Sequence, residues 1–112
     1  YTPSIADSLS ISSSTYTTLM SGMRRVITGN STLSNYFSGI NATVGGKTGT
    51  AQVGGKKDFA LFAGFAPFDD PEIVAVCVLE QGINGGNAAI PVARVFDKYF
   101  DLKSASDVEN AG

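Results

Sequence analysis

The sequence predicts an α+β domain in which an antiparallel β-sheet is flanked by helices. Three observations predict this fold: a helical apolar period at about residues 14 to 28, three strand candidates in quick succession over residues 44–80, and a second helical stripe over residues 87–101. With 112 residues, 43% of them hydrophobic and 16% charged, the chain has the size and composition of one small globular domain.

The first predicted element is the helix at about residues 14 to 28. The segment before it, residues 1–12, mixes serine, proline and scattered apolar residues without a period, which indicates extended chain. The serines at 12–14 are candidate N-caps, and Gly29 is expected to stop the helix in a left-handed conformation. Apolar side chains at helical spacing define one face of this helix: Tyr16, Leu19, Met20, Met23, Val26 and Ile27.

Three strands are predicted after a loop at residues 30–43 that contains a short helical turn. They occupy residues 44–53, 58–67 and 72–80, and Gly54-Gly55 indicates a hairpin between the first two. The third strand is apolar at seven consecutive positions. Strands of that kind are usually covered on both faces, so we expect helices on each side of the sheet, or a helix on one side and another layer on the other.

The last predicted element is a helix at residues 87–101. Asn87 can cap it, and Pro91 would then lie in the first turn, where its missing N–H costs nothing. We expect residues 1–103 to form the domain and residues 104–112, which are polar and aperiodic, to form a tail. The buried stripe of the helix is predicted to comprise Ile90, Ala93, Phe96, Tyr99 and Phe100.

Composition excludes several classes of function. A net charge of −2, with no more than two neighbouring basic residues, argues against a nucleic-acid partner. The longest apolar run is far shorter than the roughly 20 residues of a membrane helix, so no membrane segment is expected in this chain, and an anchor or export signal would lie outside it. The chain has no histidine and one cysteine, which argues against Ser-His-Asp and Cys-His catalysis and against most zinc sites within it. We expect no metal.

The run V-G-G-K-T-G-T-A-Q-V-G-G at residues 44–55 is compatible with two chemistries, a phosphate-binding loop and a strand edge. Gly46-Lys47-Thr48 matches the end of the P-loop pattern, but Asn41 stands where its first glycine should be. A P-loop also continues into a helix, and the glycines that follow leave too few residues for one. The strand is therefore favoured.

This run also carries a family resemblance. Lys47-Thr48-Gly49 is the K-T-G triplet of penicillin-binding proteins and class A β-lactamases. The longer G-K-T-G-T-A-Q follows a G-M-R-R-V-I helix and precedes F-A-L-F-A-G-F-A-P, an apolar strand and G-I-N-G-G-N-A-A-I-P-V-A-R-V-F. This ordered set resembles the C-terminal end of the transpeptidase domain of class B penicillin-binding proteins, from about Ile11 to Phe100. The resemblance implies the β-lactamase-like α+β fold.

The resemblance also implies an activity and roles for four residues. The parent would be a peptidoglycan D,D-transpeptidase that works through an acyl-serine, needs no cofactor, and binds stem peptides and β-lactams. Lys47 would be catalytic, adding positive charge and hydrogen-bonding the serine of a second motif. The hydroxyls of Thr48 and Thr50 would hold the carboxylate of the donor peptide or β-lactam, and the backbone N–H of Thr50 would be an oxyanion-hole donor. Gly49 would let the acyl group approach the backbone.

The sequence departs from the complete family in lacking two motifs. No S-x-x-K occurs, because no serine stands three positions before any lysine, and no S-x-N occurs either. We therefore expect the chain to be inactive alone and to need the missing N-terminal part of the transpeptidase domain, from the same or another chain. The resemblance places the parent at the outer face of the bacterial cytoplasmic membrane.

Other interpretations remain open at this stage. Lys47 could be a solvated lysine on a glycine-rich hairpin, and its threonine neighbours ordinary strand residues. Within the same fold, the parent could be a β-lactam sensor or a β-lactamase. The chain could also be a non-catalytic binding or assembly module.

Overall fold

The computed structural model describes residues 1–52, 54–55, 57–81 and 84–111. As predicted, residues 1–12 have no regular secondary structure and are exposed. In the described chain the helices and strands follow the order α1 (Ser13–Thr28), α2 (Ser31–Phe37), β1 (Gly45–Ala51), β2 (Phe59–Ala66), β3 (Ile73–Leu79) and α3 (Gly85–Ala111).

The three strands form one antiparallel sheet in the order β1-β2-β3. Gly49 of β1 lies opposite Leu61 of β2, and Phe62 of β2 lies opposite Cys77 of β3. The turn between β1 and β2 includes Gly55 at φ 75°, a left-handed conformation that glycine adopts without strain. The predicted α+β fold, the three strands and the hairpin are confirmed.

The first helix begins and ends for identifiable reasons. The Ser12 side chain caps its N-terminus by accepting a hydrogen bond from the N–H of Thr15 at 3.1 Å. The predicted left-handed stop at Gly29 is wrong, because that residue has φ −84°. Glycine there allows close packing instead, since a Cβ would lie 2.8 Å from the carbonyl oxygen of Arg25.

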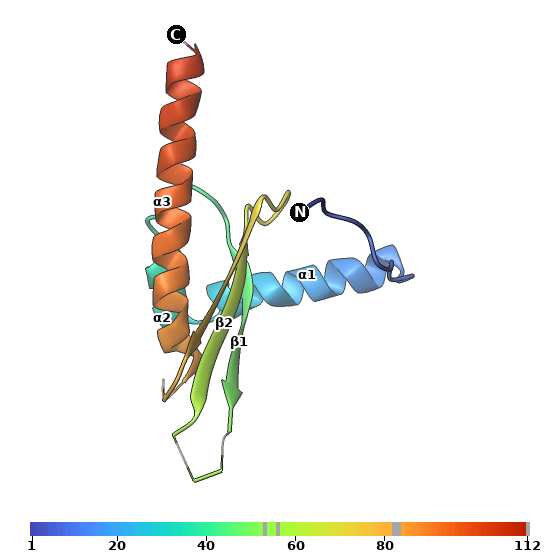
Figure 1. Ribbon diagram of the computed structural model, residues 1–112, viewed down its shortest axis with the longest axis vertical. Helices are drawn as coiled ribbons and strands as arrows, with labels where there is room; N and C mark the ends of the chain where they lie inside the picture. The colour runs from blue at the N-terminus through green and yellow to red at the C-terminus, as the bar shows by residue number, and fades with distance from the viewer. Residues whose placement is uncertain (53, 56, 82–83, 112) are drawn as a thin grey trace.

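The sheet lies between helices on its two faces (Figure 1). One face is covered by α3, which packs on β2 and β3, and α2 packs beside α3. The opposite face carries α1, which packs on β1 and crosses the strands at a steep angle. The Arg24 side chain fixes this contact, because its Nη1 donates to the carbonyl oxygen of Val44 at 2.7 Å, one residue before β1 begins.

The core lies between α3, α2 and the covered face of the sheet. Alternate β2 residues, among them Phe62, point into it, as period-2 burial requires. The Phe37 ring stacks on that of Phe62 with centroids 5.6 Å apart, and its centroid is 6.4 Å from that of Phe96. Phe62 and Phe96 are both fully buried, so each contributes roughly 1.5–3 kcal/mol of transfer free energy.

The helix α3 differs from its prediction at both ends. It begins at Gly85, capped by Asn84, whose Oδ1 accepts from the N–H of Gly86 at 2.9 Å, so Asn87 is not the cap. Pro91 consequently lies in the second turn. At the other end, residues 104–111, predicted as a tail, continue the helix, and its last turns project beyond the sheet (Figure 1). No helix in the described ranges has the length and apolarity that crossing a bilayer requires.

The third strand is covered on one face only, which corrects part of the prediction. Its alternate residues from Ile73 to Leu79 pack against the core beneath α3. Val74, Val76 and Val78 point to the other face and remain 70%, 65% and 53% exposed. Helices do lie on both sides of the sheet, but α1 packs on β1 and no described element covers these three valines.

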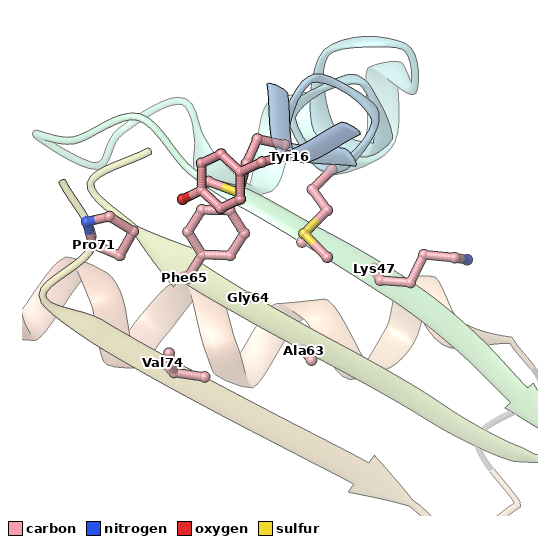
Figure 2. A pocket seen from close by; sticks show the side chains of 10 residues that line it. Tyr16, Lys47, Ala63, Gly64, Phe65, Pro71 and Val74 are labelled. Atoms are coloured by element: carbon pink, nitrogen blue, oxygen red, sulfur yellow. The ribbon is translucent and has the colours of Figure 1, made fainter. Parts of the chain in front are cut away.

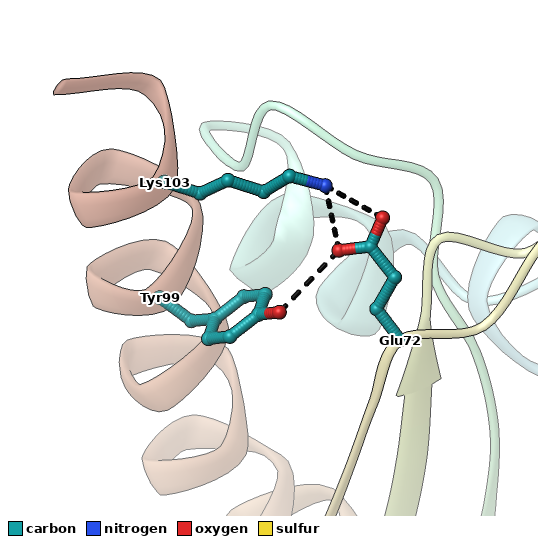
Figure 3. A network of polar contacts seen from close by, with 3 residues as sticks. All are labelled: Glu72, Tyr99 and Lys103. Atoms are coloured by element: carbon teal, nitrogen blue, oxygen red, sulfur yellow. Dashed lines mark hydrogen bonds and ion pairs between the residues drawn. The ribbon is translucent and has the colours of Figure 1, made fainter. Parts of the chain in front are cut away.

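A polar network ties the start of β3 to α3 (Figure 3). Lys103 Nζ donates to both carboxylate oxygens of Glu72, at 2.6 and 2.7 Å, and the Tyr99 hydroxyl donates to Oε2 at 3.3 Å. The hydrogen bond from Lys103 lowers the pKa of Glu72 below its ordinary value of 4.5. The same bond raises the pKa of Lys103 above its ordinary value of 10.5.

This network predicts a small pH dependence of stability. Because the folded pKa of Glu72 is lowered, its contribution is present above pH 4.5 and is lost as the pH falls through the folded pKa. We expect Glu72→Gln to lower the thermal unfolding midpoint at neutral pH, by a modest amount because the pair is exposed, and to have no effect once both proteins are neutral at position 72. Asp70→Asn, in the same exposed turn, controls for net charge. Equal shifts for both variants at neutral pH would contradict the assignment.

Candidate functional site

All four predicted site residues lie in β1: Lys47, Thr48, Gly49 and Thr50. This strand stands at one side of the sheet, since it pairs with β2 and no other described strand flanks it. The chain therefore presents the backbone of the K-T-G-T run at a sheet edge, where N–H and C=O groups without strand partners can receive an extended peptide. Because the run lies inside a strand and the next element in the described residues is the strand β2, the P-loop alternative is excluded.

The lysine lies on the side of the sheet that faces α1 (Figure 2). It is exposed, and it borders an apolar hollow of about 360 Å³ that is also lined by Met20 and Met23 of α1 and Phe65 of β2. The ammonium group of Lys47 donates to the carbonyl oxygen of Thr48 at 2.8 Å. In this chain the positive charge is thus held beside its own strand.

The two threonines lie on the opposite face from Lys47, since alternate strand residues point to opposite faces. Thr48 and Thr50 line a polar hollow of about 490 Å³ together with Asn84 and Gly85 at the start of α3. The hydroxyl pair and the ammonium therefore do not share one face. What they share is the free edge of β1, and only a ligand lying along that edge can contact both sides.

The glycines of β1 fall into two groups according to the space around them. A Cβ on Gly46 would lie 2.7 Å from the carbonyl oxygen of Ala63 and 2.7 Å from Cζ of Phe62, so the fold requires glycine there. A Cβ on Gly49 would meet only Leu61, at an ordinary contact of 3.5 Å, and its φ is not positive. Packing and backbone conformation therefore give no reason for glycine at position 49.

This contrast predicts opposite effects of the same substitution. We expect Gly46→Ala to destabilise the chain by about 1–3 kcal/mol through overpacking. Gly49→Ala should leave stability unchanged or raise it by about 0.4–1 kcal/mol, because the native conformation accepts alanine and the unfolded chain loses freedom. Urea denaturation of both variants measures the difference. If Gly49→Ala were as destabilising as Gly46→Ala, the fold itself would require the glycine.

Two residues that support β1 were not identified from the sequence. In the sequence Arg24 has the pattern of a solvated side chain, yet its Nη1 holds the carbonyl oxygen of Val44, the residue before β1. Its position beside the apolar stripe of α1, next to Met23, is the only available signal. Gly85 precedes the helix predicted at residues 87–101, whereas in the structure it is buried and opens α3 beneath Thr48 and Gly49.

The fold and this edge strand define the class of the protein. Residues 1–98 match the family model "Penicillin binding protein transpeptidase domain", and the chain belongs to that family. The match covers α1, α2, the sheet and the first half of α3, and the suspected relationship to class B penicillin-binding proteins is confirmed.

Particular relatives agree with this assignment. The chain is 37% identical to the peptidoglycan D,D-transpeptidase MrdA of Haemophilus influenzae over 73% of its own residues. Its fold superposes on Pseudomonas aeruginosa PBP2 bound to WCK 5153 with a TM-score of 0.72 and 31% identity, covering 87% of this chain and 23% of that one. PBP2 of Helicobacter pylori, solved in complex with MreC, gives a TM-score of 0.69 at 25% identity, covering 80% of this chain and 17% of that one. The chain spans only 15% of the length of the Haemophilus protein.

Proposed function

We propose that this chain is the peptide-docking part of a longer peptidoglycan D,D-transpeptidase. The observation that carries the proposal is Gly49, a glycine that neither packing nor backbone conformation demands, in the middle of an edge strand. An edge strand with an open position can take an extended peptide by strand addition. Membership of the transpeptidase family and similarity to the named D,D-transpeptidase support a peptidoglycan stem peptide as the ligand.

Each residue of the motif has a role in this proposal. Thr48 and Thr50 hold the terminal carboxylate of the donor peptide or of a β-lactam, and the backbone N–H of Thr50 donates to the oxyanion. Lys47 supplies fixed positive charge beside the nucleophile, which lowers the barrier to forming an anion. Its ammonium would exchange its bond with Thr48 O for the serine of the second motif when the rest of the domain is present.

The reaction of the longer protein follows covalent catalysis. The oxygen of a serine attacks the carbonyl carbon of the penultimate D-Ala, and terminal D-Ala leaves with the proton that the serine lost. An amine of a neighbouring peptidoglycan strand then attacks the acyl-serine, forms the cross-link and frees the serine. The nucleophile would come from the part of the domain that this chain does not include, and the setting would be the outer face of a bacterial cytoplasmic membrane.

A fluorescent penicillin tests whether the nucleophilic serine lies outside this chain. Because the chain has no S-x-x-K, we expect no covalent adduct after incubation with it, as judged by denaturing electrophoresis and mass spectrometry. A longer protein that contains both this sequence and an upstream S-x-x-K should form a stoichiometric adduct. An adduct on the chain alone would contradict the proposal.

Two further functions are distinguishable by experiment. A β-lactam sensor or a β-lactamase of the same fold would differ from a transpeptidase in how fast the complete protein deacylates. A non-catalytic binding or assembly module would bind its partner regardless of position 49, so its binding would survive Gly49→Val.

A further inference from the structure

The first residue of α3 lies directly against the backbone of the motif strand. A Cβ on Gly85 would lie 2.9 Å from the carbonyl oxygen of Gly49, 2.9 Å from that of Leu61 and 2.9 Å from Cβ of Thr48. From these contacts we infer that Gly85 is a positioning residue for the K-T-G-T strand. The inference rests on the proposed function only where it predicts an effect of Gly85 on ligand binding.

Close approach is the reason for glycine at this position. Gly85 is buried and does not have a positive φ, so its backbone conformation does not call for glycine. Glycine in a helix is also less favourable than alanine. The two oxygens nearest the added Cβ belong to the main chains of β1 and β2, and neither can move away as a flexible side chain can. Any larger residue must therefore displace either the two strands or the start of α3.

The start of α3 is the less movable of these parts. Its first turn is held by Asn84, whose Oδ1 accepts from Gly86 N–H and whose carbonyl accepts from Asn87 N–H at 3.2 Å. One turn further on, Ala88 and Ala89 are fully buried in the core. By contrast, β1 is an edge strand that pairs with β2 alone among the described strands. We therefore expect a side chain at position 85 to push β1, and with it Thr48 and Gly49, out of place.

The adjacent glycine provides a matched control. A Cβ on Gly86 would meet only the side-chain Oδ1 of Asn84, at 3.0 Å, so the cost of this change falls on the helix cap and not on the sheet. Gly85→Ala and Gly86→Ala thus make the same chemical change one residue apart in the same helical turn. Only the first change contacts the sheet.

Amide NMR spectra of the ¹⁵N-labelled chain test the inference without any ligand. In Gly85→Ala we expect shifts at the amides of residues 47–51 and at Leu61, together with an unfolding midpoint lower by at least about 5 °C. In Gly86→Ala the shifts should stay at Asn84 and in the first turn of α3, and the midpoint should fall by less than in Gly85→Ala, because only the cap has to adjust. The inference is overturned if the Gly85→Ala shifts are confined to α3, or if both variants perturb β1 equally.

A ligand titration adds a readout that loss of stability alone does not change. With a peptide ending in D-Ala-D-Ala, followed at the β1 amides well below the unfolding midpoint, Gly85→Ala should bind about tenfold more weakly than Gly86→Ala, since misplacing a site by a fraction of an ångström weakens its contacts. Equal affinity of the two variants would overturn the positioning role. If the wild-type chain itself fails to bind, the docking proposal is wrong, while the ligand-free spectra still decide the role of Gly85.

Discussion

Replacing Phe62 with alanine is expected to cost about 3–5 kcal/mol of folding free energy, a large part of the roughly 5–15 kcal/mol that stabilises a typical domain. The ring is fully buried, stacks on Phe37 and fills the space beneath Gly46. Its removal leaves a cavity between the sheet and α3 that the surrounding backbone cannot close. Circular dichroism during urea denaturation should show a strongly reduced midpoint or no cooperative transition.

Val76→Ala is the control for this prediction. Val76 lies on the neighbouring strand but is 65% exposed, so its truncation should change the unfolding free energy by less than about 1 kcal/mol. Similar losses for the two variants would mean that the core does not lie on the α3 face.

Replacing Gly49 with valine is expected to remove ligand binding while the chain stays folded. Valine favours strands, and a Cβ at this position meets only Leu61 at 3.5 Å. The added methyl groups would, however, project from the edge strand on the side of Lys47, beside the backbone along which the proposed peptide would lie. We expect the dissociation constant for a peptide ending in D-Ala-D-Ala to rise at least about tenfold, equivalent to roughly 1.4 kcal/mol.

Ala63→Val is the control, because it distinguishes the effect of a larger side chain on the edge strand from that of a larger side chain elsewhere on the sheet. Ala63 is exposed and pairs with Lys47, but it lies on β2, one strand in from the edge. This variant should bind as the wild type does when both are titrated by NMR. Binding that survives Gly49→Val would favour the non-catalytic module, and loss in both variants would point to a binding surface on the sheet face.

Local sequence patterns were sufficient to predict the helices and strands and to place the four site residues on one strand. The second and third strands follow from apolar runs separated by the turn around Asp70, the first from its place before the Gly54-Gly55 turn, and α1 from its apolar period. The four motif residues are consecutive and lie inside the strand predicted at residues 44–53, so one strand carries them all. Period-2 alternation alone already implies that Lys47 and Thr48 point to opposite faces.

Tertiary contacts account for what was missed. Asn84 caps α3 in place of the predicted Asn87, and the position of the cap depends on how α3 meets β1 and β2. Gly85 resembles any glycine of a loop until its distance to Gly49 is known. Arg24 resembles a solvated arginine until α1 is placed across β1. For Gly85 and Arg24 the partner is distant in the chain, and periodicity carries no information about it.

The projecting end of α3 provides an attachment point for a fluorophore or a sensor surface. The helix has 27 residues, so at about 1.5 Å per residue its two ends are roughly 40 Å apart. The end at Gly85 lies against the motif strand, whereas residues 101–107 are exposed throughout. A probe tethered beyond Ala111 would therefore leave the free edge of β1 open to solvent during optical or surface-based assays.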